Sequence, residues 1–238
     1  MAVDRIVAIV GVGPGLGASL ARRFAARGFA TALIARTPNQ VEPEAAQIRN
    51  EGGRALAITA DASDPDSLRA AFARIRNELG HPDVLIHNAS AFVPGGVLDL
   101  EPAQFEQVWR VTALGALVGA QEVLPAMISA GRGTILLTGA TASVRGGARF
   151  AAFSSAKFAL RALAQSMARE FGPKGVHVAH VIIDGQIDTP LLRQTQPDRD
   201  PTTALSPDAI ADVYLRLHLQ HPTTWTHELD LRPATERF

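Results

Sequence analysis

Residues 5–20 read RIVAIVGVGPGLGASL, and this stretch decides the fold. A short apolar run at 6–10 is followed by four alternating glycines and then by a helical pattern at 18–27, which predicts a strand, a tight turn and a helix. Glycines let a backbone turn sharply and approach a diphosphate, and a helix N-terminus attracts the negative charge. The stretch predicts a dinucleotide cradle, with a merely structural strand-helix turn as the alternative. The residues of this cradle are Gly11, Gly13, Gly15, Leu16 and Gly17.

The composition limits the class of protein. The chain has 238 residues and is 47% hydrophobic, which is enough to bury one large core, so a single domain over 1–238 is expected. Lys+Arg and Asp+Glu both number 23, which gives no electrostatic reason to bind nucleic acid or a membrane surface. Cysteine is absent, which excludes disulfides and thiolate metal sites, and no metal site is predicted. The first apolar run is too short to span a bilayer, so a cytoplasmic location is expected.

Short apolar runs alternate with helical patterns along the whole chain. This alternation predicts right-handed βαβ crossovers and a doubly wound α/β fold, a parallel seven-stranded sheet with helices on both faces. The ligand of such a sheet lies outside the carboxyl ends of the strands. The predicted strands are 6–10, 30–34, 55–59, 84–87, 133–138, 176–183 and 227–231. The predicted helices are 18–27, 43–51, 66–79, 102–130, 153–171 and 207–220.

Candidate binding residues follow several of these strands. Arg36 has no carboxylate beside it and suits the 2′-phosphate of NADP, which favours NADP over NAD; the alternative is an ordinary solvated loop arginine. Asp61 and Ala62 are candidates for the adenine edge, although Asp61 equally fits a helix cap. Asn88 and Ala89 lie in a small-residue turn, where a flat ring fits against the backbone.

In their order and spacing these features resemble the short-chain dehydrogenase/reductase family over nearly the whole chain. The glycine turn matches GxxxGxG, residues 87–90 match NNAG, and Lys157 matches the lysine of YxxxK. The resemblance implies a Rossmann fold that binds NAD(P)(H), with Lys157 on the nicotinamide ribose. It also implies a homodimer or homotetramer built on the two long helices at 102–130 and 153–171.

The segment after the sixth strand extends the resemblance. Residues 184–189, DGQIDT, stand where the family has PG followed by a threonine that contacts the cofactor. The cofactor contacts expected here are Gly185, Ile187 and Thr189. The loop at 188–206 is rich in Pro, Gln, Asp and Thr and stands where family members keep a mobile lid over the substrate.

The catalytic positions depart from the family. The tyrosine position holds Phe153, which has no exchangeable proton, and the helper serine position holds Ala140. The family's asparagine aligns with Thr112, so only Lys157 of the four remains, either as a cofactor-binding residue or as an ordinary helix-surface lysine.

A displaced group would have to replace the missing phenol. The chain has one tyrosine, Tyr214, and its helical spacing predicts a packing residue. His87 titrates near neutrality but fits a hydrogen-bonded histidine at a strand end better. The remaining hydroxyl candidates, which donate hydrogen bonds but are too weakly acidic to give up a proton unaided, are Thr141, Ser143 and Ser154.

Two functions therefore stay open at this point. The first is an oxidoreductase that transfers hydride between nicotinamide and a small carbonyl or a conjugated alkene, with a non-standard proton donor. The second is a non-catalytic dinucleotide-binding sensor or scaffold subunit. Apolar residues near Arg145 and Arg149 suit an acyl chain or an aromatic acid, or else form a helix-packing surface. These apolar residues are Phe92, Val93, Ala140, Ala142, Phe150 and Phe153.

Overall fold

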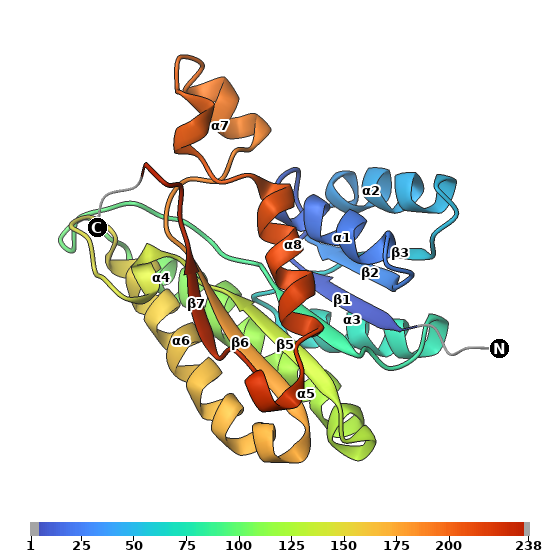
Figure 1. The fold of residues 1–238 in the computed structure, drawn as a ribbon. Coiled ribbons are helices and arrows are strands. Elements are labelled where there is room, and N and C mark those ends of the chain that lie inside the picture. Colours follow the sequence, from blue (N-terminus) through green and yellow to red (C-terminus); the bar gives the residue numbers. More distant parts are fainter. Residues whose placement is uncertain (1–4, 236–238) are drawn as a thin grey trace.

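A seven-stranded sheet runs through the centre of the molecule (Figure 1). The computed structural model describes residues 5–235, so residues 1–4 and 236–238 of the expected single domain lie outside the described part. The strand order is β3-β2-β1-β4-β5-β6-β7, and every neighbouring pair is parallel, which confirms the predicted fold class. The strands are β1 (Ile6–Val10), β2 (Ala30–Ala35), β3 (Ala55–Thr59), β4 (Val84–His87), β5 (Gly133–Thr138), β6 (Val176–Ile183) and β7 (Glu228–Leu231).

Helices cover both faces of this sheet. Residues of α3, α5 and α6 form one buried apolar cluster with one face, and residues of α1, α2 and α8 form another with the opposite face. Every residue of β1, β2, β4 and β6 is consequently buried, which explains why these strands are mainly apolar. The helices are α1 (Leu16–Ala25), α2 (Pro38–Asn50), α3 (Pro65–Glu78), α4 (Pro102–Trp109), α5 (Gly115–Ala130), α6 (Ala151–Phe171), α7 (Pro190–Thr195) and α8 (Pro207–His218).

The helix predicted over 102–130 is not continuous. A π-helical turn, Arg110–Leu114, separates α4 from α5. The Nε2 atom of the buried His87 lies 3.1 Å from the carbonyl oxygen of Val111, so this carbonyl has a partner outside the helix. The stretch Pro102–Ala130 is long and apolar enough to cross a membrane, but 61% of its most apolar window is buried in the fold, so it is a core helix here. Single π turns occur frequently at functional sites, and the sequence pattern has no signal for them.

Two further expectations about local structure were wrong. Helix α2 begins at Pro38 rather than at 43, because proline fits the first turn of a helix and Pro43 is tolerated within the same helix. The region 188–206, expected to be a loop, contains α7, whose N-cap Thr189 accepts a hydrogen bond from the amide of Leu192 at 3.1 Å. In Figure 1 this region projects beyond the edge of the sheet at the top of the molecule.

Candidate active site

The glycine turn packs directly against the end of β4. Gly11 has a φ angle of +95°, and a Cβ atom on it would lie 2.3 Å from the amide nitrogen of Ala89. The side-chain amide of Asn88 donates a hydrogen bond of 2.8 Å to the carbonyl oxygen of Gly11. Glycine is therefore required at position 11, and Asn88 fixes the turn as well as lining the cavities beside it.

The start of α1 presents backbone donors to a cleft. Within residues 5–235, the amides of Gly13, Leu16 and Gly17 have no hydrogen-bond acceptor, and all three residues line this cleft. A Cβ atom on Gly13 would meet open space, whereas one on Gly15 would lie 2.7 Å from Cγ2 of Thr189. Unpaired amides at a helix N-terminus attract an anion. The predicted cradle thus has the donors and the space that a diphosphate requires.

A smaller cavity of about 190 Å³ lies beyond the ends of β2 and β3. Arg36 lines it, and its exposed guanidinium has no hydrogen-bond or ion-pair partner in the described part of the chain. Ala62 lines the cavity but Asp61 does not; both the amide and the hydroxyl of Ser63 donate to Asp61 Oδ1 at 2.8 Å. The alternative that Asp61 caps the helix is wrong, since Asp64 is the N-cap of α3.

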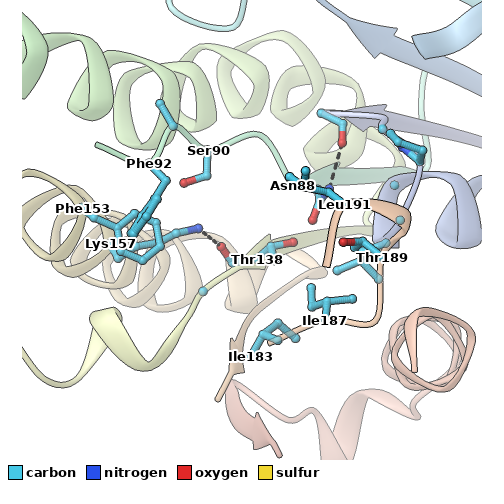
Figure 2. A pocket seen from close by; sticks show the side chains of 18 of the residues that line it. Asn88, Ser90, Phe92, Thr138, Phe153, Lys157, Ile183, Ile187, Thr189 and Leu191 are labelled. Carbon is cyan, nitrogen blue, oxygen red and sulfur yellow. Dashed lines mark hydrogen bonds between the residues drawn. The ribbon is translucent and has the colours of Figure 1, made fainter. Parts of the chain in front are cut away.

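The larger cleft, of about 450 Å³, continues from the glycine turn to α6 (Figure 2). It shares residues with the smaller cavity, among them Gly13 and Asn88, so the two hollows adjoin at the turn. The predicted contacts Gly185, Ile187 and Thr189 all line it. The other side chains that Figure 2 labels around the cleft are Ser90, Phe92, Thr138, Phe153, Lys157, Ile183 and Leu191.

Lys157 is buried at the α6 end of this cleft. Its Nζ atom donates a hydrogen bond of 2.7 Å to the carbonyl oxygen of Thr138, drawn as a dashed line in Figure 2. Its side chain is 3% exposed, and this burial lowers the pKa of Lys157 to about 7 because a desolvated ammonium is costly. The helix-surface alternative for Lys157 is therefore wrong.

An aromatic group lies beside Lys157. The ring centre of Phe153 is 5.7 Å from the Nζ atom of Lys157, and Phe153 packs edge-to-face against Phe92 with centroids 5.2 Å apart. The ring centre of Phe150 lies 5.5 Å from that of Phe92, and both residues are exposed, although only Phe92 lines the cleft. This end of the cleft is thus mainly apolar, and its polar residues are Lys157, Thr138 and Ser90.

The other two positions that the family resemblance predicts to be substituted do not reach the cleft. Ala140 follows β5, and its amide donates to the hydroxyl of Ser143 at 3.1 Å. Thr112 is buried in the π turn, and its hydroxyl lies 3.3 Å from that of Ser90. Neither Ala140 nor Thr112 is among the residues that line the cleft.

The candidate substitutes for the phenol do not line the cleft. His87 is completely buried, and burial lowers its pKa to about 4, with the charge of Lys157 adding to the effect. The hydroxyl of Thr141 donates to the carboxylate of Asp184. Tyr214 is a core residue as predicted; its hydroxyl lies 2.8 Å from that of Thr138, and burial raises its pKa. Ser143 and Ser154 are buried and do not line the cleft.

Sequence reasoning missed a polar network behind Lys157. Arg161, one helical turn after Lys157, forms two hydrogen bonds of 2.7 Å to Glu228. Glu228 in turn lies 3.0 Å from Nδ1 of the buried His180, and burial lowers the pKa of His180 to about 4. The spacing of Lys157 and Arg161 was the one available signal, since it places two cations on the same helix face.

Comparison with known proteins agrees with this geometry. The family model described as short chain dehydrogenase matches residues 5–200. A cis-4-hydroxycyclohexanecarboxylate dehydrogenase of Sinomonas cyclohexanicum is 30% identical over 219 residues, which cover 88% of this chain and 87% of that protein.

Two solved structures share the fold. A short-chain dehydrogenase from Rhodopseudomonas palustris is 38% identical, with a TM-score of 0.84 over 96% of this chain and 98% of the other. A metagenomic short-chain oxidoreductase in complex with NADP is 27% identical, with a TM-score of 0.85 over 98% of this chain and all of the other. The doubly wound sheet and the match to the family model together define the class as an oxidoreductase. The chain belongs to the short-chain dehydrogenase/reductase family.

Proposed function

We propose that the protein is an NADP(H)-dependent oxidoreductase that transfers hydride between nicotinamide and a small, largely apolar carbonyl or conjugated alkene. The observation that carries the proposal is the pair of adjoining hollows, which run from the unpartnered Arg36 past the glycine turn to Lys157. In NADP the 2′-phosphate, the diphosphate and the nicotinamide ribose follow one another in the same order as Arg36, the glycine turn and Lys157. The metagenomic relative crystallised with NADP supports the same cofactor.

The residues present fit such a cofactor. The free amides of Gly13, Leu16 and Gly17 would bind the diphosphate, and Arg36 would pair with the 2′-phosphate. Lys157 would bind the nicotinamide ribose, as the family resemblance implies. The cofactor would supply the hydride. The protein would orient the cofactor, exclude water and donate or accept the proton.

The substrate end of the cleft favours an apolar molecule. Phe92 and Phe153 form one wall, and Leu191 of α7, which is 67% exposed, lines the cleft as well. We propose that the lid region 188–206 closes Leu191 over the substrate. The Sinomonas relative acts on a carboxylated cyclohexane ring, and the exposed Arg149, next to Phe150, offers a cation for such a carboxylate.

The proposal includes a changed proton-handling set. Phe153, Ala140 and Thr112 stand at the tyrosine, serine and asparagine positions of the family, so neither a phenol nor its helper serves this site. Reduction of a conjugated C=C bond suits such a site, because hydride addition gives an enolate that needs a weaker acid than an alkoxide does. We further propose that the protein works in the cytoplasm as a homodimer or homotetramer built on α4, α5 and α6.

Cofactor consumption tests this function. NADPH oxidation should be followed with a panel of cyclic ketones and the matching enones, alongside NADPH binding by fluorescence. We expect tight NADPH binding and faster oxidation with enones than with ketones. Tight NADPH binding without oxidation for any substrate would instead favour the sensor or scaffold function. Phe153 at the tyrosine position of the family is the observation that favours this alternative.

Replacing Arg36 by alanine tests the cofactor assignment. We expect the Kd for NADPH to rise roughly 10-fold to 100-fold, since a charge-assisted hydrogen-bond pair contributes about 1.5–3 kcal/mol. The Kd for NADH should change little, because NADH has no 2′-phosphate. The matched control is Arg27→Ala, which removes an exposed arginine that does not line either cavity. Equal weakening of NADPH and NADH would contradict the assignment.

A further inference from the structure

The choice of lysine at position 157 is unusual for this chain. Lysine supplies two of its 23 basic residues, Lys157 and Lys174, and all the others are arginines. Arginine stays protonated at every physiological pH, whereas a buried lysine can lose its proton. The chain therefore has a cation that can release a proton at the point where α6 meets the cleft.

Lys157 also differs in its chemistry from the other residues that line the cleft. Among the described residues that line the 450 Å³ cleft, it is the single ionisable side chain. An ammonium has three N–H donors, and the structure gives Nζ one acceptor, the carbonyl oxygen of Thr138. The wall beside it is the ring of Phe153, which cannot accept the proton. Of the two remaining donors, one is available to the nicotinamide ribose and the other to a substrate oxygen.

The groups around Lys157 leave its charge uncompensated. His87 on β4 and His180 on β6 face it, and both have a pKa of about 4, so they are neutral at pH 7. Glu228 is the nearest carboxylate in this network, and its charge is already paired with Arg161. The hydroxyl of Tyr214 reaches Thr138 and not the lysine. Burial without a counterion lowers the pKa of Lys157 to about 7, a suitable value for proton transfer near neutrality.

We propose that Lys157 is itself the catalytic acid and base of this site, in addition to its cofactor contact; this inference rests on the proposed oxidoreductase function. NADPH would supply a hydride to the carbonyl carbon, and the C=O π pair would then move to the oxygen. An Nζ–H bond breaks and an O–H bond forms, which leaves an alcohol and a neutral amine. The amine then takes a proton from water. In the oxidation direction the neutral amine accepts the hydroxyl proton while hydride leaves the carbon.

The first test measures the proton on Lys157 directly. Because the chain has two lysines, [ε-¹³C]lysine labelling gives two NMR signals, and Lys174→Arg assigns them. We expect the Lys157 signal to titrate near pH 7 in the free protein. We also expect kcat/KM for reduction to fall about tenfold per pH unit above that midpoint, because only the ammonium donates. A Lys157 signal that stays protonated to pH 10 would overturn the inference.

The second test separates proton transfer from cofactor binding. Lys157→Arg keeps the charge and the donors but cannot release a proton, so we expect NADPH affinity within about fivefold of wild type and at least a hundredfold loss of kcat. Lys157→Met should lose activity equally, while Lys174→Arg should keep it. Retention of activity within threefold by both Lys157 variants would overturn this inference but not the proposed function. If the wild-type protein binds NADPH but does not oxidise it with any of the substrates tested, the proposed function is overturned, and this inference with it.

Discussion

The double substitution Phe153→Tyr and Ala140→Ser raises kcat/KM for ketone reduction by about a hundredfold, the low end of what a positioned general acid contributes. A tyrosine at 153 places its ring where the phenylalanine ring now lines the cleft, 5.7 Å from Nζ of Lys157. The ammonium there favours the phenolate, which lowers the pKa of the new phenol. The phenol then delivers the proton, and Lys157 stabilises the resulting charge. Steady-state NADPH oxidation with cyclic ketones measures the change.

The structure offers a matched control for this gain. Phe158→Tyr adds the same hydroxyl to the same helix, on a side chain that is 42% exposed and does not line the cleft. It should leave ketone reduction unchanged. The gain should be smaller for enones, since protonation of an enolate limits the rate less. If the double variant and Phe158→Tyr behave alike, the proposal that the missing phenol at position 153 limits ketone reduction is wrong.

The sheet was predictable from the sequence because its signals are local. Runs such as Ile6–Val10 are apolar throughout, since both faces of a parallel strand are buried, and this burial leaves a continuous pattern in the chain. The glycine turn was predictable for the same reason, because the φ of +95° at Gly11 restricts the residue type at that position.

Features that depend on distant contacts were not predictable. The π turn at Arg110–Leu114 goes together with the contact of His87 with Val111, 24 positions away, and neither residue signals it alone. The side chain of Asp61 accepts hydrogen bonds from Ser63 and does not line the cavity. The sequence is compatible with either arrangement and does not show which one forms. The lowered pKa of Lys157 depends on its burial against β5, so the sequence predicted its position but not its chemistry.

Lowering the pH from 7 to 5 should destabilise the fold by about 4 kcal/mol through His87 and His180 alone. Burial lowers the pKa of each from 6.5 to about 4, so the unfolded chain binds these protons more readily than the folded chain. Their stabilising contribution is complete above pH 6.5 and is lost as the pH falls toward 4. His218, with a pKa also lowered to about 4, acts in the same direction. Urea unfolding at both pH values measures the difference.

The variant His87→Asn isolates one of these contributions. Asparagine does not titrate, so the stability difference between pH 7 and pH 5 should shrink by about 2 kcal/mol. His81→Gln, at an exposed position, should leave the difference unchanged. An unchanged difference in His87→Asn would show that another group carries the acid sensitivity. Because Val111 lines the smaller cavity, protonation of His87 should also weaken NADPH binding before the chain unfolds.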